Sequence, residues 1–192
     1  MASPTGNSRF VRAIGPGEIF MGLTTAVTLP VELPQDTPFD ADLVSVGFTT
    51  SGNSLSIGTE RIPVRVAERL REIRFKAGPS SAMLAFSMAE VSPVNIARAI
   101  PGATTTVTTA GSTRVAMPKT AGTERYTVVW VAEDNLVACV LSRCFVSTTG
   151  ELTNGPADSG DPAALSIECA VEDAGAGVDD LYWLFDSALV TA

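Results

Sequence analysis

Residues 42–57, with the sequence DLVSVGFTTSGNSLSI, carry the pattern of two β-strands joined by a tight turn. Apolar side chains alternate with polar ones on both sides of a polar centre, as they do in half-buried strands. The apolar positions are Val44, Val46, Phe48, Leu55 and Ile57. In the centre, Gly52 and Asn53 can adopt positive φ at low cost. The stretch therefore predicts a β-hairpin, whose tip comprises Thr49, Thr50, Ser51, Gly52 and Asn53.

Residues 126–146 predict a second hairpin as clearly as the first. The segments 126–131 (YTVVWV) and 136–146 (LVACVLSRCFV) are rich in β-branched and aromatic residues, and Glu133-Asp134-Asn135 favours a turn between them. Further strands are expected at 17–29, with a kink at Gly22, and at 83–88, 163–171 and 181–185.

Residues 59–77 are compatible with two structures. Ile62, Val64 and Val66 alternate as in a strand, whereas Val66, Leu70 and Ile73 have the spacing of an amphipathic helix over 67–77. Gly78-Pro79-Ser80-Ser81 favours a turn after this region.

A short helix is predicted at about 92–100. Ser92 is a suitable N-cap and Pro93 a suitable first helical residue, while Pro101-Gly102 ends the helix. With seven to nine short strands and this helix, the chain is expected to be mainly β, an antiparallel sandwich or barrel with one flanking helix. We expect a flexible arm at 1–16 and one domain at 17–192, with long loops near 30–41 and 149–162.

Charge is distributed unevenly along the chain. Residues 1–100 carry 9 basic and 9 acidic side chains, whereas residues 101–192 carry 4 basic and 12 acidic ones. This balance argues against a nucleic-acid reader, which needs basic patches. The one basic cluster is either a solvated face or a contact with the acidic half of a neighbouring subunit; it comprises Arg65, Arg69, Arg71, Arg74 and Lys76.

The sequence offers little that could carry out chemistry. It has no histidine, and its three cysteines show no ligand spacing, so they are expected to be small core residues. The acidic pairs at 133–134, 172–173 and 179–180 lie beside turn signals and lack the spacing of a calcium loop. No apolar run approaches the roughly 18–20 residues that span a bilayer. We therefore expect no catalytic, metal or cofactor site and no membrane partner.

The features of the first half follow a definite order. An apolar strand and a proline-rich link lead to Gly47-Phe48 and a turn containing Gly52. A strand that ends near Glu90 and a short helix with Asn95 follow. This order of features resembles the major tail proteins, or tail tube proteins, of long-tailed siphophages. The resemblance covers roughly residues 17–102, and the second half is similar only in style.

This resemblance implies a β-sandwich subunit that forms six-membered rings stacked into a hollow tube. The tube would enclose a tape-measure protein, join terminator and tip proteins, and conduct DNA without binding it. Such a protein would be assembled in the bacterial cytoplasm and would reside in the virion. It further implies that residues 61–77 and 80–88 are strands, facing the lumen or a neighbouring subunit, and that residues 49–53 contact the next ring or only solvent.

Two other classes of protein remain open. One is a different virion β-protein, such as a tail terminator or a head-decoration protein. The other is a carbohydrate-binding or adhesion module, which would display aromatic side chains on its surface. Trp130 and Trp183 are both expected in the core, and this placement disfavours such a module.

Overall fold

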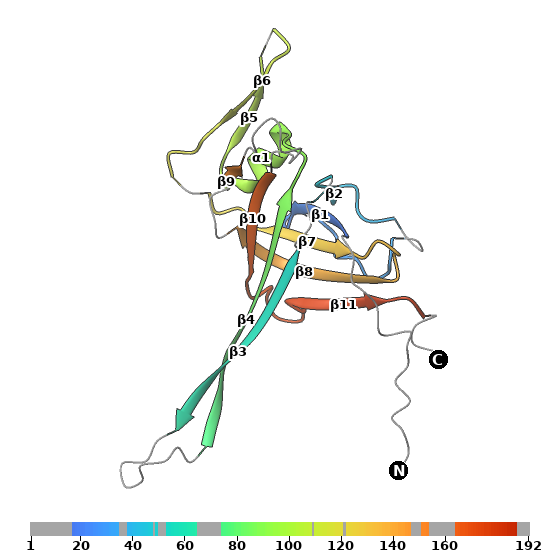
Figure 1. Ribbon diagram of the computed structural model, residues 1–192, viewed down its shortest axis with the longest axis vertical. Helices are drawn as coiled ribbons and strands as arrows, with labels where there is room; N and C mark the ends of the chain where they lie inside the picture. Colours follow the sequence, from blue (N-terminus) through green and yellow to red (C-terminus); the bar gives the residue numbers. More distant parts are fainter. Residues whose placement is uncertain are drawn as a thin grey trace.

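A computed structural model describes residues 17–34, 38–47, 49, 53–64, 74–108, 110–120, 122–146, 151–153 and 164–187. In these ranges the chain forms eleven strands and one short helix, and every strand pair is antiparallel. The predicted fold class, mainly β with one flanking helix, is thus confirmed (Figure 1).

One nine-stranded sheet forms the body of the molecule. Its path runs, in spatial order, through β2 (Val44–Ser45), β1 (Glu18–Leu23), β7 (Tyr126–Val131), β8 (Val137–Val146), β10 (Ala164–Val171), β4 (Arg74–Met88) and β3 (Ser54–Val64). Two strands branch from this path, β11 (Leu181–Phe185) beside β8 and β9 (Glu151–Thr153) beside β10. The second sheet is a separate hairpin of β5 (Thr104–Val107) and β6 (Thr113–Ala116).

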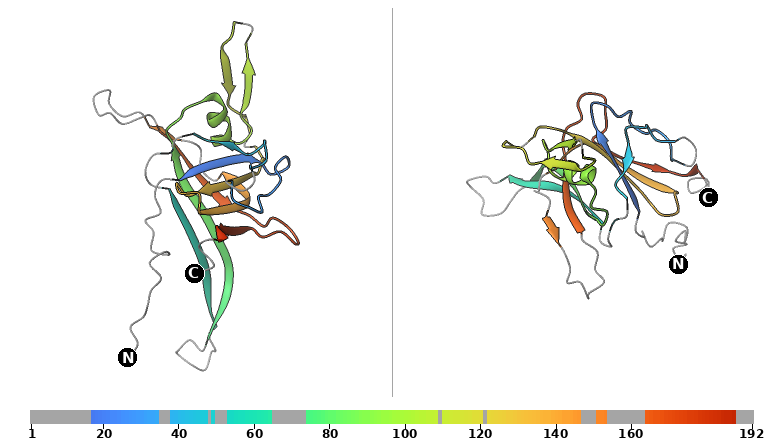
Figure 2. Two further views of the ribbon diagram at one scale, coloured as in Figure 1. Left: turned by 90° about the vertical axis from the view of Figure 1, so that its right-hand side faces the viewer. Right: turned by 90° about the horizontal axis from the view of Figure 1, so that it is seen from above.

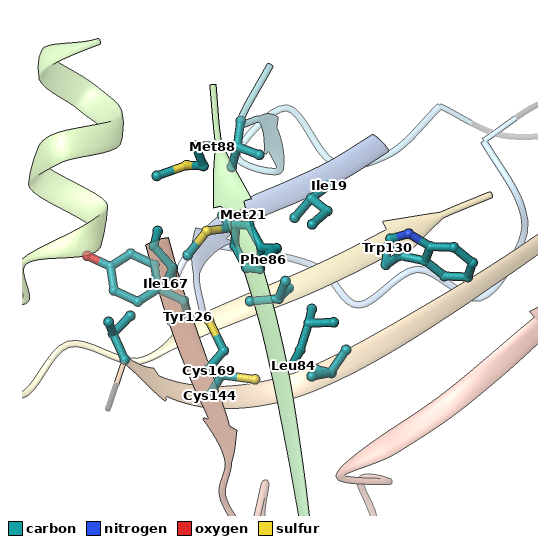
Figure 3. Close-up of a cluster of buried hydrophobic side chains, with 14 of the residues drawn as sticks. Ile19, Met21, Leu84, Phe86, Met88, Tyr126, Trp130, Cys144, Ile167 and Cys169 are labelled. Carbon is teal, nitrogen blue, oxygen red and sulfur yellow. The ribbon is translucent and has the colours of Figure 1, made fainter. Parts of the chain in front are cut away.

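The main core lies where this sheet folds over on itself. Side chains from β1, β7 and β8 meet those from β10 and β4, and all six residues of β7 are buried. Figure 3 shows Ile19, Met21, Phe86 and Ile167 gathered in this core. A second cluster, on the other face of β7 and β8, contains Val129 and Val140, with Leu33 and Leu43 from the segment that follows β1. Burial of β7 and β8 on both faces explains their continuous apolar sequence.

Helix α1 (Pro93–Ala99) matches its prediction. The Ser92 hydroxyl accepts a hydrogen bond from the Asn95 amide at 3.2 Å, and Pro93 occupies the first turn. The helix ends at Ile100, and Gly102 follows with φ of +84°. Ala99 is fully buried in the main core, so the helix is anchored by one face.

The hairpin predicted at 42–57 is wrong. β2 pairs with β1, at Met21 opposite Val44, and β3 pairs with β4, at Leu55 opposite Leu84. Gly47, with φ of +80°, lies between the two segments. Alternation located strand residues correctly here, but it carries no information about which strands pair.

Of the two structures left open for 59–77, the strand is observed over the described residues 59–64 and 74–77, so the helix alternative is wrong there; the turn expected at 78–81 is also wrong, because these residues belong to β4. The register shifts between Thr59, opposite Ser80, and Arg61, opposite Ala77. Gly78-Pro79 therefore lies in a β-bulge, one of the few places in a strand that tolerate proline. Pairing with β3 overrides the local helical spacing.

Other predicted segments also differ in detail. The strand expected at 17–29 ends at Leu23, where a turn begins, and the loop expected at 149–162 contains the short strand β9. The loop near 30–41 has no strand in its described part, as predicted. The hairpin predicted at 126–146 is confirmed, with Val131 opposite Ala138.

Candidate assembly surfaces

The hairpin of β3 and β4 extends well beyond the body of the molecule. β10 pairs with β4 only from Met83 to Met88, so β4 between Arg74 and Ala82 has β3 on one side and no described strand on the other. We call this part, residues 57–64 of β3 and 74–82 of β4, the distal ribbon. Figures 1 and 2 show it projecting from one end of the molecule.

The outer edges of the distal ribbon are open. β3 is the last strand of the sheet path, and it carries Ile57 with 60% of its surface exposed. Isolated two-stranded hairpins are at best marginally stable in water, and open edges are templates for pairing with another chain. The distal ribbon therefore has the properties of an element that is completed by a partner.

A second arm projects from the opposite end. β5 and β6 form a two-stranded sheet whose only described partners are each other, and in Figures 1 and 2 it points away from the distal ribbon. All four residues of β5 are exposed, with Val107 at 71%, and Met117 just after β6 is 68% exposed. The Thr-rich sequence forms this extended arm because β-branched residues favour strands.

β11 is an edge strand with exposed aromatic residues. Trp183 is 38% exposed and Phe185 is 52% exposed, and their rings stack with centroids 6.4 Å apart. The prediction that Trp183 lies in the core is therefore wrong, whereas Trp130 is buried as expected. The alternation in LYWLF places Tyr182 and Leu184 against the second cluster; on the other side of the strand, Leu181 packs against the main core, while Trp183 and Phe185 stay exposed.

Three of the residues that carried the sequence resemblance meet in the structure. Asn95 is 3% exposed, and its amide nitrogen donates to the carbonyl oxygens of Val46 and Glu90, each at 2.9 Å. A side chain at Gly47 would collide with the Glu90 carboxylate. Asn95 thus ties helix α1 to the ends of β2 and β4, a structural role that accounts for this residue combination.

The predicted contact residues fall partly outside the described residues. Arg65, Arg69 and Arg71 lie outside them, as do Thr50, Ser51 and Gly52, whereas Arg74 and Lys76 are on the outer half of β4. Thr49 forms an isolated antiparallel β-bridge with Met88. The Asn53 side chain donates a hydrogen bond to the Thr49 hydroxyl at 3.4 Å. Because the strands on either side of 49–53 do not pair with each other, these residues are not the tip of a two-stranded hairpin. Their part in subunit contacts stays a prediction.

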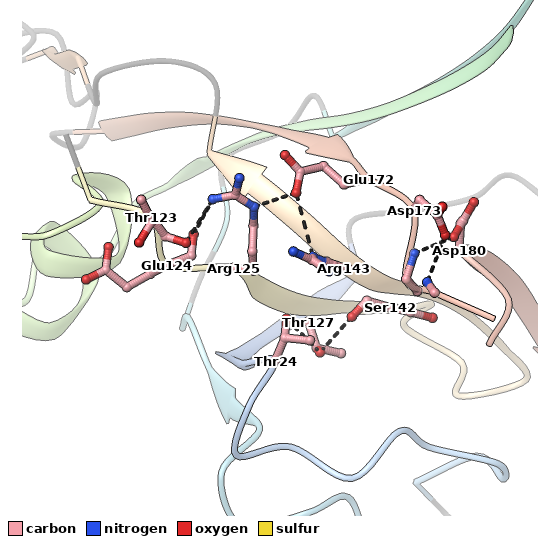
Figure 4. A network of polar contacts seen from close by, with 12 residues as sticks. Thr24, Thr123, Glu124, Arg125, Thr127, Ser142, Arg143, Glu172, Asp173 and Asp180 are labelled. Carbon is pink, nitrogen blue, oxygen red and sulfur yellow. Dashed lines mark hydrogen bonds and ion pairs between the residues drawn. The ribbon is translucent and has the colours of Figure 1, made fainter. Parts of the chain in front are cut away.

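Several acidic residues of the second half stabilise turns, and one takes part in an ion-pair cluster. Glu172 contacts Arg125 and lies 3.7 Å from Arg143 (Figure 4). Asp173 accepts from the Gly175 amide at 2.8 Å, and Asp180 accepts from the Ala174 amide at 2.7 Å. In the described ranges, no group of three or more acidic or cysteine side chains is arranged to hold a metal ion.

The three cysteines are buried thiols, and burial raises their pKa values. Those of Cys139 and Cys169 rise to about 12, and that of Cys144 also rises. A thiol that stays protonated at neutral pH is a poor nucleophile and a poor metal ligand. These side chains therefore act as small apolar core residues, as predicted from the sequence.

The described residues also contain one open groove of about 440 Å³ beside α1. Leu23, Val44 and Val94 line it and are each about half exposed, and Arg98 and Glu124 lie on its wall. Burial lowers the pKa of the Arg98 guanidinium and raises that of the Tyr126 hydroxyl, which also lines the groove. No described helix is long and apolar enough to cross a membrane.

Comparison with known proteins gives no family assignment. No family model and no curated protein matches the sequence. Among solved structures, a cryo-EM structure of the anti-feeding prophage cap, described as the AFP tube terminating cap, matches with a TM-score of 0.46 and 13% identity. The match covers 97% of this chain and 100% of that one. A likeness this distant carries no argument about function.

Proposed function

We propose that this chain is a structural subunit of a phage tail tube, which acts by assembling with copies of itself and not by catalysis. The observation that carries the proposal is the distal ribbon, a two-stranded extension with open edges on both sides. Such an extension contributes little to the stability of one molecule, because it adds few contacts to the core. Its value lies in strand pairing with another subunit, which removes the open edges.

The residue pattern of the first half also supports a tail-tube subunit. The resemblance to siphophage tail tube proteins rests on Gly47-Phe48, Gly52, Glu90 and Asn95 within an ordered series of strands and a helix. Three of these residues, Gly47, Glu90 and Asn95, converge at the junction of β2, β4 and α1. A pattern scattered over about 50 positions of the sequence thus corresponds to one structural joint.

We further propose the arrangement that this class of protein implies. Six subunits would form a ring, rings would stack into a tube within the virion, and the tube would enclose a tape-measure protein and later conduct DNA. The net charge of −8 is consistent with a tube through which DNA passes without adhering. Arms at opposite ends of the subunit are suited to contacts between stacked rings.

The test is the assembly state of the purified full-length chain. Sedimentation velocity over a concentration series should reveal large species, and negative-stain microscopy should show hollow tubes. A chain that stays monomeric at every concentration would overturn the proposal. Discrete single rings that never elongate would instead assign the chain to the end of a tube, as a terminator.

A further inference from the structure

We infer that β11 is the acceptor edge for the distal ribbon of a second copy of this chain, which adds to β11 as an extra strand. This contact rests on the proposed function, since it is one through which subunits of a tube would join. Strand addition to an open edge gains affinity from backbone hydrogen bonds and specificity from side chains.

One edge of the β11 backbone faces β8, and no described strand pairs with the other edge. The Asp180 carbonyl accepts from the Ser142 amide at 3.0 Å, and the Asp186 amide donates to the Leu136 carbonyl at 2.9 Å. Even-numbered residues of β11 therefore direct their backbone groups toward β8, and odd-numbered ones direct theirs to the other edge, where no described strand pairs. The residues whose backbone N–H and C=O groups point to this second edge are Leu181, Trp183 and Phe185.

Two of these three residues are the exposed aromatics. The Trp183 ring stacks on Phe185 and meets Trp130 edge-on, each pair with centroids 6.4 Å apart. Aromatic side chains, tryptophan above all, supply much of the binding energy at the centre of protein interfaces. Open backbone groups and exposed rings therefore coincide at two positions of β11, Trp183 and Phe185.

β11 is held in place before any partner arrives. The Tyr182 hydroxyl donates to the Pro30 carbonyl at 2.6 Å, and Leu184 packs against the second cluster. On the other side, the full length of β11 pairs with β8. A pre-formed edge loses little conformational entropy when a strand adds to it.

Charge selects the distal ribbon as the occupant. After Arg143 the sequence carries only acidic charges, which around β11 are Glu172, Asp173, Asp179, Asp180 and Asp186; of these, Glu172 contacts Arg125 and lies near Arg143. The described residues of the distal ribbon carry Arg61, Arg74 and Lys76 against Glu60, a net charge of +2 (3 − 1). Opposite charge steers such surfaces together and fixes their register.

The occupant must come from a second copy. The distal ribbon projects away from the body of its own subunit, and its strands do not pair with β11 in the same chain. The open edge of β4 runs from Arg74 to Ala82 and is interrupted by the bulge at Gly78-Pro79, so β11 can pair with the residues on either side of that bulge. Arg74 and Lys76 lie on that edge.

Trp183 reports directly on this contact. The chain has two tryptophans, so the Trp130→Phe variant leaves Trp183 as the only one. Acrylamide quenching of its fluorescence should fall severalfold when the variant assembles, with a blue shift of the emission. Equal quenching in monomer and assembly would overturn the inference.

A cross-link identifies the occupant in a chain that keeps both tryptophans. With cysteines at Lys76→Cys and Asp179→Cys, a short bismaleimide should join subunits into covalent multimers, because the native thiols are buried and unreactive. The control variant combines Lys76→Cys with Asp42→Cys, which lies beside β2, and this variant should form no covalent multimers. Protection of Trp183 without the cross-link would overturn the inference, since another segment would then cover β11.

Failure of this inference can be told apart from failure of the proposed function. A wild-type chain that never assembles refutes the proposed function. The role of β11 alone is refuted if the wild-type chain assembles, Trp183 stays accessible to acrylamide in the assembly, and the Lys76→Cys/Asp179→Cys chain forms no cross-link.

Discussion

The hairpins β7–β8 and β3–β4 are both long antiparallel pairs, yet they occupy opposite environments. β7 is buried along its whole length, and the pair is flanked by β1 on one side and by β10 and β11 on the other. β3 is an edge strand, and β4 pairs with β10 only from Met83 onward, so its residues before Met83 have β3 as their one described strand partner. The first hairpin has all its strand partners within the chain, and the second lacks them over its outer half.

This difference separates two sources of stability. Burial of apolar area is worth roughly 25 cal/mol per Å², so the β7–β8 pair dominates the free energy of folding of one subunit. The outer half of β3–β4 contributes little to it, yet a strand partner in a second subunit would satisfy the open edges. Changes in the first hairpin should therefore affect folding, and changes in the second should affect assembly.

Removal of the distal ribbon is expected to have the largest effect, and only on assembly. Thr59 and Ser80 face each other, so an Asn-Gly turn can replace residues 60–79 and close a shorter hairpin. The variant should remain monomeric in sedimentation velocity at concentrations where the wild type forms large species. Its thermal midpoint should stay within about 4 °C of wild type, a change of roughly 1 kcal/mol.

Two outcomes would contradict the assignment of β3–β4 to assembly and β7–β8 to folding. A shortened chain that still assembles fully would show that the ribbon is not the joining element. A shortened chain that fails to fold would show that the ribbon stabilises the subunit itself. Circular dichroism of the monomer separates the two.

Truncation of a core side chain in β8 should have the next largest effect, and only on folding. Leu141 is fully buried between the layers, and Leu141→Ala should cost about 2–5 kcal/mol in urea unfolding, because it leaves a cavity. Ile57 on β3 is the matched control, since it is 60% exposed, and Ile57→Ala should change monomer stability by less than about 0.5 kcal/mol. Equal losses at the two sites would refute the separation.

The same contrast explains how much could be predicted from the sequence. The β7–β8 pair was predicted correctly because its turn and both strands are contiguous in the sequence. Helix α1 was also predicted correctly, because its Ser92 cap and Pro93 are local signals. The partners of β2 and β3 could not be predicted, because β2 pairs with a strand about 25 residues earlier and alternation does not specify partners.

The candidate surfaces were less predictable than the fold. The exposure of Trp183 depends on β11 being an edge strand, which only the three-dimensional arrangement reveals. The continuation of β4 through Pro79 depends on a bulge opposite Glu60, and a proline after a glycine favours a turn when the partner strand is unknown. One sequence signal for a contact between subunits was the contrast in charge between the acidic end of the chain and the basic cluster.

An intermediate effect is expected at the junction of α1 with the ends of β2 and β4. Asn95 donates to the carbonyls of Val46 and Glu90, the latter just beyond the end of β4. Asn95→Ala leaves two carbonyls without this donor and should cost about 1–3 kcal/mol in urea unfolding. Asn95→Asp keeps the shape but lacks the donor, and should be at least as destabilised. If Asn95→Asp were as stable as wild type, the role assigned to these hydrogen bonds would be wrong.

The smallest effect concerns pH and belongs to the core alone. Burial raises the pKa of the Cys139 thiol to about 12, whereas a thiol in the unfolded chain ionises near 8.5. Above that pH the unfolded state releases a proton that the folded state retains, so stability falls as pH rises from about 8.5 toward 12. Between pH 7.5 and 9.5 the free energy of unfolding of the wild type should fall by about 1 kcal/mol more than that of Cys139→Ala, measured by urea unfolding at each pH. The chain shortened at residues 60–79 should show the same slope as wild type, because all three cysteines lie outside the distal ribbon; a shallower slope would mean that the ribbon shares in the protection of the core.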